Sequence, residues 1–309
     1  MTDPKTYCGF CTIIGAPNAG KSTLINSIVG EKISIVSSKV QTTRTRVLGI
    51  VVQDNAQIIF VDTPGLFKPG NDRMEKAIVA AAWQGLAESD LVLFVVDSTK
   101  GMSRPVRTIM DRLKNVHGKK YILVLNKVDD IARPKLLELT TIMNQAMEFE
   151  ATFMVSARNN DGVSDIVKYV AKRMPEGPFH YPEDQMSDMP LRLLAAEITR
   201  EKLFRAIHDE IPYDITVETE NWEEFDDGSV KIDQVIYVAR EGQKKIVLGK
   251  GGEMIGKIGQ QSRVELEEIM GRRAHIKLFV KVRENWSEDS ERYEVWGLSH
   301  SEDPKADKF

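Results

Sequence analysis

A glycine-rich segment near the amino terminus has the residue types and spacing of a phosphate-binding loop. Residues 15–22 match the pattern G-x-x-x-x-G-K-[ST] between an apolar, strand-like run and a helix-like pattern. Backbone N–H groups at such a helix start can surround a phosphate, the lysine can bridge two phosphates, and the serine hydroxyl can bind Mg²⁺. The residues predicted to contact a nucleotide here are Gly15, Pro17, Asn18, Ala19, Gly20, Lys21, Ser22 and Thr23.

The stretch Asn126-Lys127-Val128-Asp129 follows the strand-like run Tyr121–Leu125 and indicates which base the site accepts. Guanine presents N1–H and N2–H₂ donors to a fixed carboxylate, whereas adenine has no donor at N1. A site rejects the wrong substrate when its buried polar groups are left without partners. We therefore expect Asp129 to select guanine nucleotides, with Asn126 and Lys127 in the same base site.

Two further polar stretches supply candidate groups for Mg²⁺ and the terminal phosphate. Asp62 and Gly65 follow the buried strand Ile58–Val61, where the carboxylate can hold a Mg²⁺-bound water and the glycine N–H can reach the γ-phosphate. Between the phosphate loop and this strand lies a hydroxyl-rich segment. Thr43 is the favoured second Mg²⁺ ligand, with Thr42 as the alternative.

The last stretch, Ser156-Ala157-Arg158, follows a strand-like run, so one of its backbone N–H groups can reach guanine O6. The five stretches, in this order, resemble the G1 to G5 motifs of the translation-factor-like GTPases. With Tyr7-Cys8-Gly9-Phe10 and Gln41-Thr42-Thr43-Arg44, nearly the whole chain resembles the bacterial Era GTPase family. The resemblance implies GTP and GDP as ligands, Mg²⁺ as cofactor, and a GTPase reaction. The catalytic residues it implies are Lys21, Thr43, Asp62 and Gly65.

Two positions bear on how the phosphate bond would be hydrolysed. Leu66 stands where Ras-like enzymes carry the glutamine that orients the attacking water, which implies slow intrinsic turnover completed by another polar group, water or ion. Asn18 lies where related GTPases carry an asparagine that coordinates K⁺. K⁺ binding by Asn18 is therefore a hypothesis, and an asparagine that only satisfies the loop backbone is the alternative.

These motifs must be positioned by alternating strands and helices. The patterns predict strands at 10–15, 47–53, 57–62, 91–97, 120–125 and 151–155, and helices at 21–29, 72–87, 103–115, 134–147 and 163–173. This alternation predicts an α/β fold with a doubly wound, mostly parallel sheet that binds its ligand at the carboxyl ends of the strands. A turn at Asp54-Asn55 indicates one antiparallel pair at the edge.

A proline-rich segment separates this pattern from a second one. The predicted organisation is a nucleotide-binding domain over 1–173, a linker over 174–190, a smaller α+β domain over 191–285, and an acidic tail over 286–309 without an assigned function. The smaller domain shows a helix at 191–207, strands at 214–220 and 229–239, helical segments and a final strand.

The order α-β-β-α-α-β, with G-x-x-G between the middle helices, resembles the type II KH domain, whose loop holds about four single-stranded nucleotides. Residues 240–283 carry eleven basic and five acidic side chains, which indicates one basic face. A solvated charged helix beside a glycine turn is the alternative interpretation. The predicted RNA-binding residues are Lys244, Lys245, Gly249, Lys250, Gly251, Gly252 and Lys257.

Composition limits the remaining function classes. The chain has 309 residues and a net charge of −4, so any attraction to nucleic acid must be local. Cys8 and Cys11 form C-x-x-C without further cysteine or histidine nearby, so we expect core packing rather than zinc or redox chemistry. The amino terminus lacks an apolar signal region, and the longest apolar run, Leu91–Val96, is too short to span a membrane.

The family resemblance implies that the partner is a single-stranded segment of small-subunit ribosomal RNA near its 3′ end, and that the protein acts on the 30S subunit in ribosome assembly. We expect a cytoplasmic monomer. Two alternatives stay open. One is a signalling GTPase at the inner face of the cell membrane that uses the basic face for anionic lipid, and the other is a switch that acts by nucleotide occupancy with negligible hydrolysis.

Overall fold

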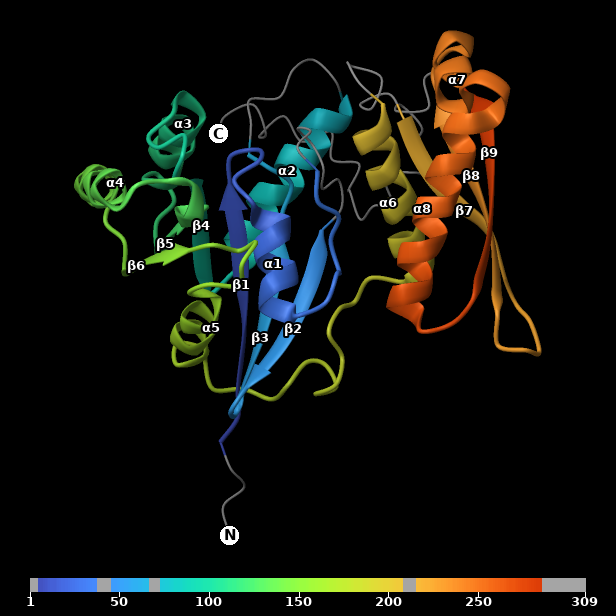
Figure 1. Cartoon of the computed structure of the whole chain (residues 1–309). Coiled ribbons are helices and arrows are strands. Elements are labelled where there is room, and N and C mark those ends of the chain that lie inside the picture. Colours follow the sequence, from blue (N-terminus) through green and yellow to red (C-terminus); the bar gives the residue numbers. More distant parts are fainter. Residues whose placement is uncertain (1–4, 38–45, 67–72, 208–214, 285–309) are drawn as a thin grey trace. The chain divides into compact units, whose positions relative to one another are not determined.

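A computed structural model describes residues 5–37, 46–66, 73–207 and 215–284 (Figure 1). The chain divides into two compact units. The first contains the described residues up to Ser34 and from Arg46 to Asp188. The second contains the short segment that starts at Ile35 and the described residues from Met189 onwards. Thr42, Thr43 and the predicted tail at 286–309 lie outside the described residues.

The first unit is built on a sheet with the strand order β2-β3-β1-β4-β5-β6. Only β2 runs antiparallel to its neighbour, and the turn at Asp54-Asn55 joins it to β3, as predicted. Every residue of β3 and β4 is buried, which is the pattern of strands covered on both faces. The strands are β1 (Tyr7–Gly15), β2 (Val47–Gln53), β3 (Ala56–Asp62), β4 (Leu91–Asp97), β5 (Lys120–Asn126) and β6 (Ala151–Val155).

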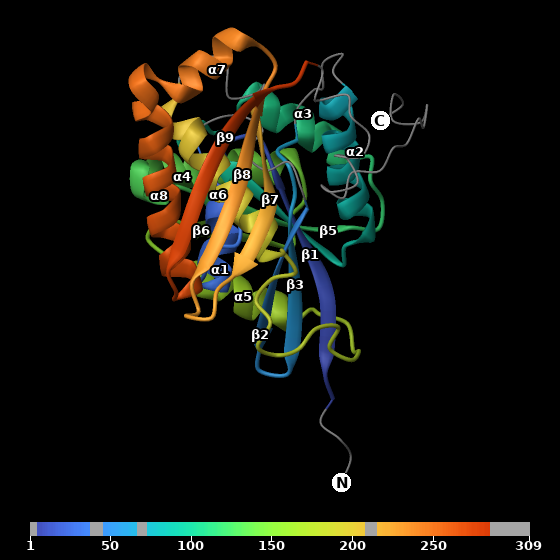
Figure 2. The ribbon, with the colours of Figure 1, turned by 90° about the vertical axis from the view of Figure 1, so that its right-hand side faces the viewer.

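In the described part of the chain, five α-helices cover this sheet. Helices α2, α3 and α4 share one hydrophobic cluster with β1, β4 and β5, whereas α1 and α5 pack together on the other face (Figures 1 and 2). Because β1 and β3 to β6 are parallel, their carboxyl ends meet at one edge. The helices are α1 (Lys21–Val29), α2 (Arg73–Glu88), α3 (Arg104–Leu113), α4 (Arg133–Ala146) and α5 (Val163–Ala171).

The segment predicted as a linker is bound along the first unit as far as Asp188. Near its start, the Cys8 N–H donates to the Pro175 carbonyl at 3.0 Å. Near its end, the Ile50 N–H donates to Met186 and the Leu48 N–H donates to the Asp188 carboxylate. Those two donors lie on β2, the edge strand of the sheet. The segment therefore occupies backbone groups that an open sheet edge would expose.

The second unit places helices on one face of a three-stranded sheet, β7-β8-β9 (Figure 2). β7 and β8 are antiparallel, whereas β8 and β9 are parallel. The first strand extends to Glu224 rather than ending at Glu220, because a bulge after Thr219 lets the acidic segment keep pairing with β8. The elements are α6 (Leu191–Ala206), β7 (Ile215–Glu224), β8 (Val230–Val238), α7 (Glu241–Leu248), η3 (Lys250–Gly252), α8 (Glu253–Met270) and β9 (Ala274–Val282).

Gln57 holds the middle of the bound segment. Its side chain is fully buried, its Nε2 donates to the Tyr181 carbonyl at 2.8 Å, and its Oε1 accepts from the N–H groups of His180 and Tyr181. Replacing Gln57 by leucine should destabilise the first unit by about 2–4 kcal/mol, because these backbone groups lose their partners. Hydrogen exchange at His180 and Tyr181 should become faster.

Gln185→Leu is the matched control. Gln185 is half-buried, and its amide donates to the Ser187 carbonyl within the same segment, so exchange at His180 and Tyr181 should hardly change. Equal protection of these two N–H groups in Gln57→Leu and in the wild type would contradict the anchoring role of Gln57.

Candidate nucleotide site and G-x-x-G loop

The predicted phosphate loop connects β1 to α1 at the carboxyl edge of the sheet. Gly20 caps the helix in a left-handed conformation, with φ at 95°, and a Cβ there would lie 2.2 Å from the Asn126 amide nitrogen. Only glycine fits such a position. Asn18 is also left-handed, with φ at 64°, a conformation that asparagine tolerates better than most residues. Thr23 lies half-buried in the first turn of α1.

Lys21 is buried, and its Nζ donates to the carbonyls of Gly15 and Ala16 at 3.2 Å each. Burial lowers the pKa of Lys21 to about 8, and the nearby Asp62 carboxylate offsets part of that lowering. An ammonium held in a poorly solvated site gains most from an anionic ligand, because little water competes for it. The arrangement is suited to binding phosphate.

Asp62, Ser22 and Ser34 converge at the end of β3. The hydroxyls of Ser22 and Ser34 both donate to the same Asp62 carboxylate oxygen, each at 2.9 Å. The amide oxygen of Asn26 accepts from the N–H groups of Ile33 and Ser34 and so shapes the turn that carries Ser34. The structure thus brings the two predicted Mg²⁺ groups, Ser22 and Asp62, together. Ser34 was not predicted from the sequence, because this residue belongs to none of the motifs.

The turn after Asp62 lies against the phosphate loop. A Cβ on Gly65 would lie 3.2 Å from Pro17, so the backbone of this glycine approaches the loop closely. The Leu66 N–H donates to the Gly15 carbonyl at 3.1 Å. Its side chain is 3% exposed and packs in the core cluster with Ile14. Leu66 therefore presents no polar group to the site.

Asn126 joins the base motif to two other loops. Its Nδ2 donates to the Ala19 carbonyl at 3.0 Å, and its Oδ1 accepts from the Ala157 N–H at 3.1 Å. The next residue, Lys127, is left-handed and donates to the Asn18 carbonyl at 2.8 Å and to Asp97 at 2.6 Å. The side chain of Asp97 was not among the predicted site residues, although a carboxylate directly after a buried strand was the signal that identified Asp62.

Asp129 has an exposed carboxylate at the rim of this cluster. Hydrogen bonds from the Ser156 hydroxyl and the Asn159 amide, with the nearby Arg158 charge, keep the pKa of Asp129 below its usual range. The group is therefore ionised at neutral pH and can only accept hydrogen bonds. That is the property required of a partner for guanine N1–H and N2–H₂. Ala157 is buried, whereas the Arg158 side chain is exposed.

The G-x-x-G segment links α7 to α8 in the second unit. Gly249, Gly251 and Gly252 all have positive φ, at 72°, 62° and 83°. A Cβ on Gly249 would lie 2.6 Å from that of Met254, whereas a Cβ on Gly251 or Gly252 would meet none of the described residues within 4 Å. Gly249 is thus needed for packing, while the two later glycines leave the backbone open to a ligand. Lys245, Lys250 and Lys257 are exposed, and Lys244 is half-buried.

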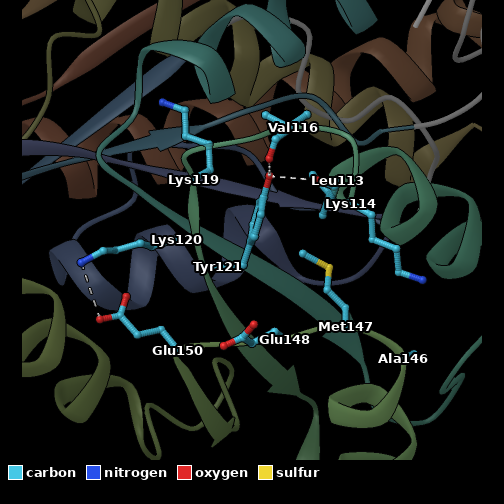
Figure 3. Close-up of a pocket in the computed structure, with 10 residues that line it drawn as sticks. All are labelled: Leu113, Lys114, Val116, Lys119, Lys120, Tyr121, Ala146, Met147, Glu148 and Glu150. Carbon is cyan, nitrogen blue, oxygen red and sulfur yellow. Dashed lines mark hydrogen bonds and ion pairs between the residues drawn. The ribbon is translucent and has the colours of Figure 1, made fainter.

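A separate groove of about 740 Å³ lies at the amino end of β5, the opposite end of that strand from Asn126 (Figure 3). Burial raises the pKa of Tyr121 to about 12, and its hydroxyl donates to the Leu113 carbonyl at 3.2 Å. The groove shares no residue with the nucleotide cluster. Its lining residues are Leu113, Lys114, Val116, Lys119, Lys120, Tyr121, Ala146, Met147, Glu148 and Glu150.

Comparison with known proteins identifies the family. A model described as 50S ribosome-binding GTPase matches residues 10–127, and a KH domain model matches residues 210–287. GTPase Era of Sinorhizobium medicae is 56% identical over 293 residues, which cover 95% of this chain and 94% of that protein. The chain belongs to the Era GTPase family. GTPase Era of Brucella suis is 53% identical, with 95% of this chain and 94% of that protein covered.

Two solved Era structures match each with a TM-score of 0.90. One is a variant of Aquifex aeolicus Era bound to GDP and AlF₄⁻, at 37% identity, covering 95% of this chain and all of that one. The other is Era in complex with MgGDPNP and nucleotides 1506–1542 of 16S ribosomal RNA, at 38% identity, covering 95% and 99%. These matches confirm the predicted family and fold class. Among the described residues, no helix has the length and apolar composition needed to cross a membrane.

The pKa of Lys21 predicts how nucleotide affinity in this Era family member depends on pH. Below pH 8, Lys21 of the free protein is already protonated. Above pH 8, Lys21 must take up a proton on binding, because the bound phosphate raises its pKa. Affinity for GDP should therefore fall about eightfold between pH 7.5 and 9. Lys21→Met should bind more weakly, with only the pH dependence due to guanine itself. Parallel pH profiles for the two proteins would contradict the assignment.

Proposed function

We propose that this protein is a Mg²⁺-dependent GTPase that binds single-stranded small-subunit ribosomal RNA near its 3′ end and acts in 30S subunit assembly. The observation that carries the nucleotide half is the Asn126 side chain, which bonds the phosphate loop at Ala19 and the last loop at Ala157. The buried Asn126 amide therefore joins three loops that are distant in sequence, and these loops form one site. That site has a cation for phosphate and an ionised carboxylate for guanine.

The predicted catalytic residues and Ser22 each have a role in this proposal. Lys21 would contact the β- and γ-phosphates, and the Gly65 N–H would contact the γ-phosphate. Ser22 would ligate Mg²⁺ directly and Asp62 through a water, since hard oxygen ligands that converge within 2.9 Å suit this ion. Thr43, outside the described residues, would add the second hydroxyl. Bound Mg²⁺ would neutralise charge on the phosphates as it develops. GDP–AlF₄⁻ and MgGDPNP in the two solved Era structures support a guanine nucleotide and Mg²⁺ as the ligands.

Asp129→Asn should exchange guanine for xanthine specificity. The amide places a donor where guanine also offers donors, whereas the O2 atom of xanthine can accept from it. In competition assays GTP affinity should fall by about 10³-fold or more, and xanthosine triphosphate should become the preferred ligand. An unchanged preference for GTP would refute the role of Asp129.

The RNA half of the proposal rests on the open backbone at Gly251 and Gly252. Because no residue in the described part of the chain lies within 4 Å of the Cβ positions, this turn can approach a sugar-phosphate chain. The exposed Lys245, Lys250 and Lys257 supply positive charge. The 16S RNA in the solved Era complex supports this partner. The two modules are residues 1–173 and 191–285, joined by 174–190, in a monomeric cytoplasmic protein.

Gly251→Asp should weaken RNA binding by about 100-fold, because a carboxylate then faces the RNA backbone. Gly228→Asp is the matched control, since Gly228 has positive φ and the same open space but lies in the β7–β8 turn. It should bind RNA like the wild type. Fluorescence titration with the 3′-terminal single-stranded segment of 16S RNA measures both. Equal affinity of the two variants would contradict the RNA site, and GDP affinity should stay unchanged in each.

K⁺ is proposed as an additional cation, bound through Asn18 against the phosphates, where it would supply the transition-state charge that an arginine finger supplies in other GTPases and so compensate in part for Leu66. Asn18 lies in the loop between β1 and α1, and its backbone is left-handed. Hydrolysis should be at least about fivefold faster in K⁺ than in Na⁺ at equal ionic strength, and Asn18→Ala should abolish the difference. Equal rates of the wild type in both salts would exclude K⁺ activation.

A further inference from the structure

Asp97, the last residue of β4, is a buried carboxylate to which the roles above assign nothing. Within the sheet it pairs with Asn126, so it lies beside the base motif. One carboxylate oxygen accepts from Lys127 Nζ at 2.6 Å, and the other accepts from the hydroxyl and the N–H of Thr99. Burial opposes ionisation, but the bonds from Lys127 and Thr99 outweigh it and keep the pKa of Asp97 below its usual range.

The ammonium held by Asp97 reaches the phosphate loop. Lys127 Nζ donates to the Asn18 carbonyl at 2.8 Å while it contacts Asp97. The neighbouring Asn126 donates to the next carbonyl, that of Ala19. Because a trans peptide is planar, holding a carbonyl also holds the N–H of the following residue. Two consecutive peptide planes of the loop, 18–19 and 19–20, are therefore oriented from the base motif.

We propose that Asp97 is a positioning residue for nucleotide binding, which acts by holding the Lys127 ammonium on the Asn18 carbonyl so that the phosphate loop is formed before the ligand arrives. This inference rests on the proposed nucleotide site. Asp97 lies on β4, outside the five nucleotide-binding motifs. It would affect phosphate affinity indirectly, through the Lys127 side chain.

The physical reason is the flexibility of lysine. The Lys127 side chain is 33% exposed, so without a counter-charge it gains rotamer freedom and solvation by leaving the loop. The order that Asp97 maintains in the free protein would then have to be established during binding. Ordering a flexible group on association lowers affinity without altering the chemical step. The expected effect is therefore on Kd and KM, with kcat maintained.

The test is Asp97→Asn in the full-length protein, which keeps an acceptor for Thr99 and removes the charge facing Lys127. Titration with fluorescent N-methylanthraniloyl GDP should show about tenfold weaker binding, the size of one hydrogen bond to a charged group. GDP and inosine diphosphate should lose affinity by the same factor in competition, because Asp129 is untouched. The kcat at saturating GTP should stay within about twofold of wild type.

Two further variants identify the route of the effect. Thr99→Val removes a hydroxyl from the same carboxylate but leaves the Asp97–Lys127 pair, and should bind GDP like the wild type. In the Lys127→Met background, Asp97→Asn should cause no further loss, since coupled residues are not additive. A full tenfold loss in that background would overturn the proposal, as would wild-type affinity in Asp97→Asn alone. Failure of the wild type itself to bind GDP would overturn the proposed function as well.

Discussion

The buried amide of Asn126 is the interaction on which the nucleotide site depends. It is 2% exposed, and it contacts the phosphate loop, its own motif and the loop after β6. A buried amide with satisfied donors and acceptors stabilises one arrangement of the loops, because any other arrangement leaves polar groups unpaired. The loop that carries Asp129, proposed to select guanine, and the proposed phosphate loop are thereby tied to one arrangement.

The sheet makes this contact available. Parallel pairing brings Asp97 and Val155 beside Asn126 on its two sides, and places Asp62 beside Ile13 of β1. The runs that lead to the ends of β3, β4 and β5 are apolar and buried, so their last residues, Asp62, Asp97 and Asn126, bring polar side chains to the same edge. Charges of both signs meet at this edge of the sheet, because Lys21 lies close to Asp62 and Lys127 lies close to Asp97. The site is assembled by strand register rather than by any one loop.

The second unit uses glycine for two distinct purposes within four residues. Gly249 allows α7 to end against Met254, where a side chain would collide. Gly251 and Gly252 have no described neighbour within 4 Å of a Cβ position, and their positive φ is a second, conformational reason for glycine. The following helix, α8, is anchored in the core by Ile258 and Leu266, which holds the loop on a rigid support. The structure thus shows that glycines in one motif differ in the space around their Cβ positions, which the motif alone does not reveal.

The amino-acid sequence by itself determined the motifs, the element boundaries to within a few residues and the family. Those features depend on local residue spacing, as in the loop from Gly15 to Ser22. Only the tertiary structure decided that Ser22 and Ser34 bond the same Asp62 oxygen and that Asp97 pairs with Lys127. It also decided that residues 175–188 are bound along the first unit. These contacts join residues 28 to 171 positions apart, and no local pattern of polarity or periodicity specifies which distant partner a side chain will meet.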